Sequence, residues 1–381
     1  MTQQAPKALT DAAIHDGTTL HADAALLLPG DGTAQIIPVA DLPGGVAQQA
    51  LAGGIIAPGF VDLQLNGGGG VMFNDDQSVD TLRRMAEAHA RIGTAALMPT
   101  LITDTPAHSR AAIAAVEQAI AARVPGIIGI HLEGPHLSVS RKGAHSADLI
   151  RPLDDDDLTL YLDAAQRLPH VMLTLAPENA TPAQIKVLAQ AGVIVSLGHT
   201  NASYDICMAS FDAGARCVTH LFNAMSQMGN RAPGLVGAAL HHGGVHCGLI
   251  ADGIHVHPAS MATAFAAEQG NPRIFLVTDA MATAGSDISN FTLNGREVQR
   301  RDARLTLADG TLAGADLELA GAIGYLIREL GHDPQSAVAR ATSLPAAVLG
   351  DNSGWGRFSG RVDGMIHIDA TCSGVVPISA L

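Results

Sequence analysis

The 381-residue sequence predicts an α/β protein: a (β/α)8 barrel of the TIM type with a small β-sandwich domain built from both chain termini. Eight short, nearly continuous apolar runs occupy the middle of the chain, as expected of parallel strands covered on both faces. Segments with helix signals separate these runs. Both ends of the chain instead alternate apolar and polar residues between tight turns, which is typical of antiparallel strands.

The eight apolar runs are the predicted barrel strands. They cover residues 60–66, 95–100, 127–133, 171–176, 193–199, 217–221, 248–252 and 274–279. Among the helices between them, one begins with a capping box at Thr181 and has Pro182 at its first position, and others begin at Pro106 and Pro258. A doubly wound open sheet is the alternative, but no Gly-x-Gly-x-x-Gly follows a strand, which disfavours it.

The turn pattern predicts where the domains begin and end. We expect residues 1–56 and 354–381 to form the two parts of the β-sandwich domain, and residues 57–353 to form the barrel. A β-hairpin insertion is expected near residues 290–313, because this segment contains an Asn-Gly pair, the strongest short hairpin signal.

Composition excludes several classes of partner. Hydrophobic residues make up 47% and charged residues 15%, so the chain can bury a large core and is not disordered. A net charge of −14 and only 3% aromatic residues argue against nucleic acid and anionic membrane surfaces. The first residues lack an apolar stretch, so we expect no signal peptide, and no uncharged apolar run reaches about 18 residues. No Cys-x-x-Cys pair occurs among the four cysteines. We therefore expect a cytoplasmic protein that binds neither nucleic acid nor membrane.

Polar residues end four of the predicted strands, at the face where barrel enzymes place their active sites. They are Glu133, His199, His220 and Asp279. A glutamate and two histidines form an open divalent-metal site that leaves a position for water, and bound metal can lower the pKa of that water to about 7. Asp279 would then move the water proton to a leaving group. Each residue alone is more often structural, but four at strand ends favour one shared site.

Nine motifs in order extend over residues 57–314. They read APGFVDLQLNGGGG from Ala57, HLEGP from His131, KGAH from Lys142, LGHT from Leu197, THLFNAM from Thr219, RAPG from Arg231, ADGIHV from Ala251, TDA from Thr278 and LAG from Leu312. This ordered set resembles the N-acetylglucosamine-6-phosphate deacetylase family of the amidohydrolase superfamily. The terminal β segments resemble it only loosely.

The resemblance implies a role for each matching residue. Glu133, His199 and His220 match the metal ligands, Asp279 matches the proton-transfer residue, and His145 matches the histidine that helps to polarise the acetyl carbonyl. The positions that match contacts to the sugar phosphate are Ala144, Asn223, Ala224, Arg231, His255, Leu312, Ala313 and Gly314. The resemblance also implies a homodimer, in which the neighbouring subunit can supply phosphate contacts.

One departure from the wider superfamily bears on the metal. Gln64 and Asn66 replace the His-x-His that holds a second metal in many members, and amides are poor ligands for zinc-like ions. We therefore expect one divalent metal ion per subunit, with zinc first and iron, cobalt or nickel as alternatives. His136 follows the Glu-Gly-Pro motif where a bulky apolar residue is expected. We interpret it as a solvated loop residue, and an unusual substrate contact is the alternative.

The resemblance implies a metal-dependent hydrolase that deacetylates N-acetyl-D-glucosamine 6-phosphate to D-glucosamine 6-phosphate and acetate, in amino-sugar catabolism or recycling. The same reaction on N-acetylgalactosamine 6-phosphate is the alternative, because the two sugars differ at one hydroxyl. A cyclic-amide hydrolase is disfavoured by the missing His-x-His. A catalytically dead oligomeric scaffold on the same barrel is disfavoured because all four strand-end residues are present. A metal-free sugar-phosphate isomerase on a similar barrel is a further alternative, and it predicts activity that survives removal of metal by a chelator.

Overall fold

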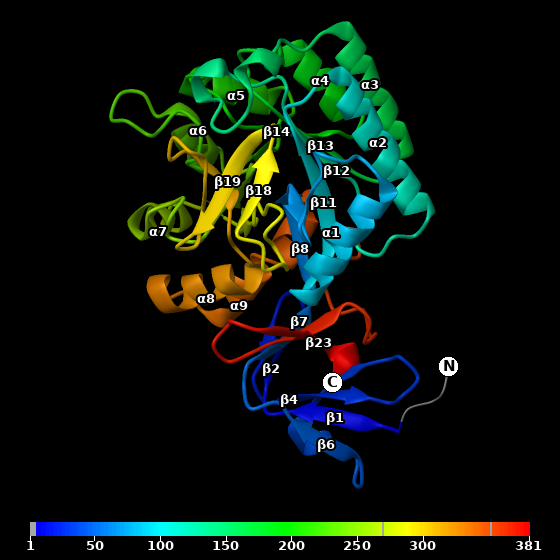
Figure 1. The fold of residues 1–381 in the computed structure, drawn as a ribbon. Coiled ribbons are helices and arrows are strands. Elements are labelled where there is room, and N and C mark those ends of the chain that lie inside the picture. Colours follow the sequence, from blue (N-terminus) through cyan, green and yellow to red (C-terminus); the bar gives the residue numbers. More distant parts are fainter. Residues whose placement is uncertain (1–4, 269, 351–352) are drawn as a thin grey trace. The chain divides into compact units, whose positions relative to one another are not determined.

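The computed structural model describes residues 5–268, 270–350 and 353–381 (Figure 1). The chain divides into two compact units. One contains the described residues up to Val61, Ala90–Ala96 and the described residues from Leu319; the other contains Asp62–His89 and Leu97–Glu318. Among the described residues, no helix is both long and apolar enough to cross a membrane.

An eight-stranded sheet whose strands follow sequence order confirms the predicted barrel. Its strands are β8 (Phe60–Leu65), β11 (Thr94–Ile102), β12 (Ile130–Glu133), β13 (Val171–Leu175), β14 (Ile194–Leu197), β15 (Cys217–Val218), β16 (His246–Leu249) and β17 (Ile274–Leu276). Pairing from β11 to β17 is parallel throughout, and a parallel bridge between Leu65 and Ala280 nearly closes the sheet. Strands β8, β12, β13 and β14 are buried at every position, which explains their continuous apolar runs.

Helices alternate with these strands. They are α1 (Val79–Arg91), α2 (Pro106–Ala121), α3 (Asp155–Arg167), α4 (Pro182–Gln190), α5 (Tyr204–Asp212), α6 (Gly234–His242) and α7 (Pro258–Ala266). Four of the helices begin where a short polar side chain accepts a backbone N–H of the first turn: Thr105, Asp154, Thr181 and Ser203. Helices α2, α3 and α4 lie side by side along the outside of β11 to β14 (Figure 1).

A four-stranded antiparallel sheet is inserted after the last barrel strand. It consists of β18 (Asn290–Leu293), β19 (Arg296–Arg301), β20 (Arg304–Thr306) and β21 (Leu312–Ala315). Asn294 and Gly295, at the first turn, both have positive φ, as a two-residue hairpin turn of type I′ requires. Buried residues of the sheet, among them Val298 and Leu305, pack in one cluster with Ile102 and Met281. The insertion therefore packs against the end of β11 and the segment that follows β17.

Two further sheets are built from the ends of the chain: a four-stranded sheet of N-terminal strands, and a five-stranded sheet that combines strands from both ends. One orders β5 (Gln35–Pro38), β4 (Ala24–Leu28), β1 (Lys7–Thr10) and β6 (Ala47–Ala50); the other orders β23 (Val375–Pro377), β22 (Met365–Ile368), β7 (Ile55–Pro58), β2 (Ala13–His15) and β3 (Leu20–His21). Leu9, Leu26, Ile14, Ile56 and Met365 share one core cluster, so the two sheets bury a common core. This part confirms the predicted sandwich of both termini.

The same unit also contains α8 (Leu319–Leu330), α9 (Pro334–Ala339) and α10 (Ser343–Val348). The sequence-based limits instead place these helices in the barrel domain of residues 57–353, and those limits stay predictions. The remaining short elements are β9 (Gly67–Gly68) and β10 (Val71–Met72), with 3₁₀ turns at Val39–Asp41, Val139–Arg141, Ala147–Leu149 and Ile378–Ala380.

Candidate metal and catalytic site

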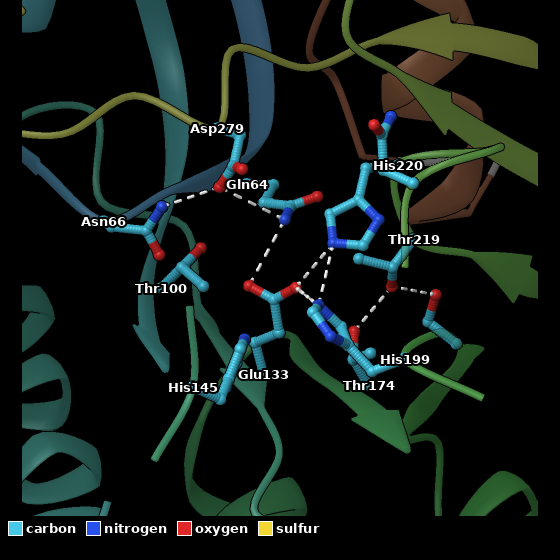
Figure 2. A network of polar contacts seen from close by, with 12 residues as sticks. Gln64, Asn66, Thr100, Glu133, His145, Thr174, His199, Thr219, His220 and Asp279 are labelled. Carbon is cyan, nitrogen blue, oxygen red and sulfur yellow. Dashed lines mark hydrogen bonds and ion pairs between the residues drawn. The ribbon is translucent and has the colours of Figure 1, made fainter. Parts of the chain in front are cut away.

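The four strand-end residues point toward one another at one end of the barrel (Figure 2). Glu133 is the last residue of β12, whereas His199, His220 and Asp279 each follow a strand by two or three residues. The side chains of Glu133, His199 and His220 are almost completely buried. These four residues are irregularly spaced along the chain, but the fold brings them together in one cluster.

The backbone at three of these residues is left-handed. His199, His220 and Asp279 have φ values of 47°, 30° and 49°. Such conformations cost about 1–3 kcal/mol each for residues other than glycine, and they persist where the surroundings determine them. Here the backbone is tied on both sides of the site: the amide of Ser138 donates to the carbonyl of His199 (2.8 Å), and the amide of Asp279 donates to the carbonyl of Gln64 (2.9 Å).

Three potential ligand atoms converge at the centre of the cluster. Glu133 Oε1 lies 3.1 Å from His199 Nε2 and 2.9 Å from His220 Nε2, and the two Nε2 atoms are 3.0 Å apart. His199 Nδ1 lies 2.8 Å from the carbonyl oxygen of Arg141. That carbonyl can only accept, so Nδ1 carries the proton and Nε2 turns a lone pair toward the carboxylate.

A carboxylate oxygen and imidazole lone pairs repel one another unless a cation lies between them. Divalent ions of the zinc type hold such atoms at about 2.0–2.2 Å, so donors about 3 Å apart can share one ion. Burial raises the pKa of Glu133, but the neighbouring side chains of His199 and His220 outweigh it and hold that pKa well below its usual range. The carboxylate is therefore charged, and Glu133, His199 and His220 fit a divalent cation.

His145 offers a second possible ligand set. One ligand atom each from Glu133, His145 and His199 lies within 4.8 Å of the others. However, His145 Nδ1 accepts from the backbone N–H of Thr103 (3.3 Å) and lies 2.8 Å from its hydroxyl. The proton of neutral His145 is then on Nε2. Burial and the neighbouring His199 lower the pKa of His145 to about 3, so the ring is neutral. An Nε2–H group suits a hydrogen-bond donor better than a ligand, and His220 is the better candidate for the third ligand.

Gln64 and Asn66 connect the two carboxylates of the site. Gln64 Nε2 donates to Glu133 Oε2 and to Asp279 Oδ1, both at 3.3 Å, and Asn66 Nδ2 donates to Asp279 Oδ1 at 2.7 Å (Figure 2). Their amide nitrogens, which cannot ligate a metal, face the carboxylates. In the sequence, Gln64 and Asn66 stand out only as missing metal ligands, and this role is not apparent there, although they lie on either side of Leu65, the last residue of β8.

A cavity of about 250 Å³ opens beside these residues. All thirteen predicted site residues except Arg231 and Ala313 line it. The other lining residues are Asn66, for which the sequence suggested no contact, and Ile102, Gly143, Ile250, Met281 and Thr311. Arg231 is exposed in the loop between β15 and α6, and Ala313 is buried in the cluster of the inserted sheet. The contacts that these two residues make to a substrate stay predictions.

His255 is held at the cavity by Asp252. Its Nδ1 lies 2.6 Å from Asp252 Oδ2, and Asp252 Oδ1 accepts the backbone N–H groups of Ile254 and His255. Burial raises the pKa of Asp252, but the hydrogen bond to His255 outweighs it and the net pKa is lowered. Asp252 therefore stays ionised and fixes the ring, a role that the sequence did not reveal.

The interpretation of His136 as a solvated loop residue is wrong. Its side chain is completely buried. Nδ1 lies 3.1 Å from the carbonyl oxygen of Arg151, and Nε2 lies 3.0 Å from the hydroxyl of Tyr161. A polar ring fills the expected apolar position because both of its nitrogens find partners there. His136 does not line the cavity, so it secures the loop after Glu133 rather than contacting a ligand.

Comparison with known proteins places this geometry in a family. The sequence profile of the amidohydrolase family matches residues 55–357. The chain is 45% identical over 299 residues to the N-acetylgalactosamine-6-phosphate deacetylase of Shewanella sp. (strain ANA-3), covering 78% of this chain and 75% of that one. It is 32% identical over 346 residues to the N-acetylglucosamine-6-phosphate deacetylase of Haemophilus influenzae, covering 90% of each. The crystal structure of N-acetylglucosamine-6-phosphate deacetylase from Pasteurella multocida superposes with a TM-score of 0.89 at 33% identity, covering 97% of both chains.

Proposed function

The chain belongs to the amidohydrolase family, and from that premise we propose that it hydrolyses the acetamide of N-acetyl-D-glucosamine 6-phosphate, giving D-glucosamine 6-phosphate and acetate. The observation that carries the proposal is the convergence of a cation site, a neutral imidazole donor and a carboxylate on one cavity. Relatives that act on amino-sugar phosphates support this choice of substrate. Such a reaction serves amino-sugar catabolism or recycling.

The residues divide the chemistry between them. Glu133, His199 and His220 would hold one divalent ion, for which zinc is our first choice. Such an ion, when bound, polarises a carbonyl group and lowers the pKa of bound water. The Nε2–H group of His145 donates a hydrogen bond to the oxygen of the acetyl carbonyl as negative charge develops there. Asp279 takes a proton from the attacking water and delivers it to the nitrogen as the C–N bond breaks. The side-chain amides of Gln64 and Asn66 both donate to Oδ1 of Asp279, so Oδ2 is the oxygen that receives the proton.

N-acetylgalactosamine 6-phosphate is the second candidate substrate. The relative at 45% identity bears the name of the galactosamine enzyme, and the chemistry at the acetamide is the same. The deciding experiment measures acetate release by the metal-loaded protein from both 6-phosphates and from unphosphorylated N-acetylglucosamine. The larger kcat/KM identifies the epimer. Absence of acetate from both 6-phosphates would refute the proposed function, and activity that survives complete chelation would favour a metal-free reaction.

The metal stoichiometry should be about one ion per chain. Gln64 and Asn66 direct amide N–H groups at the carboxylates, so the position of a second ion is taken by hydrogen bonds. Elemental analysis after loading in excess metal and dialysis checks this. Two retained equivalents, with the second required for turnover, would contradict it.

We further propose a cytoplasmic homodimer. The support is Arg231, a phosphate-binding candidate that is exposed and lies outside the cavity of its own chain. A neighbouring subunit could bring this guanidinium to a substrate. Analytical ultracentrifugation of the metal-loaded protein tests the dimer directly.

Arg231→Ala should lower kcat/KM for the 6-phosphate by about 10- to 200-fold, because a charged hydrogen bond to phosphate contributes about 1.5–3 kcal/mol. Activity on unphosphorylated N-acetylglucosamine should change little. The matched control is Arg83→Ala, an exposed arginine on α1. Equal losses on both substrates would mean that Arg231 supports the fold or the dimer instead.

A further inference from the structure

Asp62 is a completely buried carboxyl group that the proposed chemistry leaves unused. It lies in β8, two residues before Gln64, and does not line the cavity. Its Oδ2 accepts from the hydroxyl of Thr278 at 2.5 Å. Its Oδ1 accepts from the backbone N–H groups of Gln64 (3.2 Å) and Thr278 (3.4 Å). Burying a carboxyl group is unfavourable unless hydrogen bonds compensate, so this position calls for a reason.

The three hydrogen bonds lie at the seam where the barrel closes. Strand β17 ends at Leu276, and the chain beyond it continues beside β8. There the amide of Asp279 donates to the carbonyl of Gln64 at 2.9 Å, and Leu65 forms a parallel bridge with Ala280. Few backbone hydrogen bonds join the two segments here, and the carboxyl group of Asp62 adds to them by accepting backbone N–H groups of both segments.

The hydroxyl of Thr278 connects Asp62 to the turn that carries Asp279. It donates to Asp62 and accepts the backbone N–H of Ala280 at 3.1 Å. Asp62 is thereby linked to Thr278 and Ala280, the residues before and after Asp279. The amides of Thr278, Asp279 and Ala280 are consequently all fixed. Asp279 itself has a φ of 49°, a left-handed conformation that persists only where neighbouring contacts impose it.

We propose that Asp62 is a positioning residue: through the hydroxyl of Thr278 it holds the left-handed turn at Asp279 and so aims that carboxyl group at the reacting atoms. The idea rests on the proposed deacetylation, in which Asp279 moves the proton. Asp62 holds two residues next to the catalytic carboxyl group. One of its oxygens accepts the backbone N–H of Gln64, whose side chain contacts Asp279, and the other accepts the hydroxyl of Thr278, the residue before Asp279. It touches neither the cavity nor the predicted metal ligands.

Thr278→Val tests the connection, because valine keeps the shape and removes the hydroxyl. We expect kcat to fall by about 10- to 100-fold, since small displacements of a catalytic group reach that size. KM and the metal content should stay near the parent values. Thr278→Ser should restore most of kcat. The matched control is Thr283→Val, a buried threonine whose hydroxyl has no hydrogen-bond partner among the described residues. Asp62→Asn presents an amide NH₂ or a single acceptor to Thr278, so it should lower kcat as Thr278→Val does.

A double-mutant cycle separates positioning from general loss of stability. In an Asp279→Asn background, Thr278→Val should cause no further loss of kcat, because both changes act on the same proton transfer. An equal loss in both backgrounds would overturn the proposal, as would a Thr278→Val variant of an active parent with unchanged kcat. If the parent releases no acetate, the proposed function fails by itself. A crystal structure of Thr278→Val then decides the present inference: loss of the hydrogen bond between Asn66 and Asp279 Oδ1 supports it, and its retention overturns it.

Discussion

Asp279→Asn should lower kcat by about 10²- to 10⁴-fold, the usual range for loss of general acid–base catalysis. The amide keeps the shape of the side chain but cannot take a proton from water. Asp279 is outside the proposed ligand set of Glu133, His199 and His220, so the metal content should be largely retained. The loss therefore belongs to kcat rather than to metal binding.

The same residue predicts how the rate depends on pH. Burial and the charge of Glu133 raise the pKa of Asp279 to about 6. A base must be deprotonated to act, so the rate should be full above this pKa and fall as the pH decreases through it. A divalent ion beside Glu133 would oppose the shift, which places the acidic limb at or below about pH 6. The residual activity of Asp279→Asn should lack this limb.

Steady-state kinetics between pH 4.5 and 8, with metal analysis of each protein, checks both expectations; the range brackets the pKa of about 6. Asp163→Asn, an exposed aspartate on α3, is the matched control and should behave as the parent. A near-normal kcat for Asp279→Asn would mean that another group moves the proton. Loss of metal together with activity would mean that Asp279 is a ligand.

The barrel was predictable because its signals are local. Parallel strands buried on both faces must be apolar throughout, and residues such as Thr181 mark a helix start within four positions. Glu133, His199, His220 and Asp279 could be grouped because strand ends meet at one face of a barrel. The precise strand limits were less accessible: residues 127–129 and 277–279 belong to the predicted strands but lie outside β12 and β17.

The supporting hydrogen bonds were not predictable from local patterns. Asp62 and Thr278 are 216 positions apart, and Asn66 and Asp279 are 213 apart, so no spacing in the sequence relates them. His136 was misinterpreted for the same reason. A polar residue after a proline looks like an exposed loop, and its partner Tyr161 comes from a helix 25 residues further on. Motifs identify the groups that react, whereas the contacts that fix their orientation depend on the folded chain.

His220→Ala should remove most of the bound metal as well as the activity. His220 supplies one of three converging donor atoms, 2.9 Å from Glu133 Oε1. Loss of groups that only orient a ligand already weakens metal binding by about 10- to 100-fold, so loss of a ligand should weaken it by at least about 10²-fold. Equilibrium dialysis with zinc measures the affinity, and elemental analysis of the purified protein measures the occupancy. His241→Ala, an exposed histidine at the end of α6, is the control.

Comparison with His145→Ala decides between the two possible ligand sets. Thr103 occupies the Nδ1 lone pair of His145 and leaves a proton on Nε2, so His145→Ala should keep its metal and lose rate. If instead His145→Ala loses the metal and His220→Ala binds it as tightly as the parent, then Glu133, His145 and His199 are the ligands. In that case the hydrogen bond from Thr103 would have to break when the ion binds. Only the pair of variants distinguishes a donor from a ligand, because each variant alone should be nearly inactive.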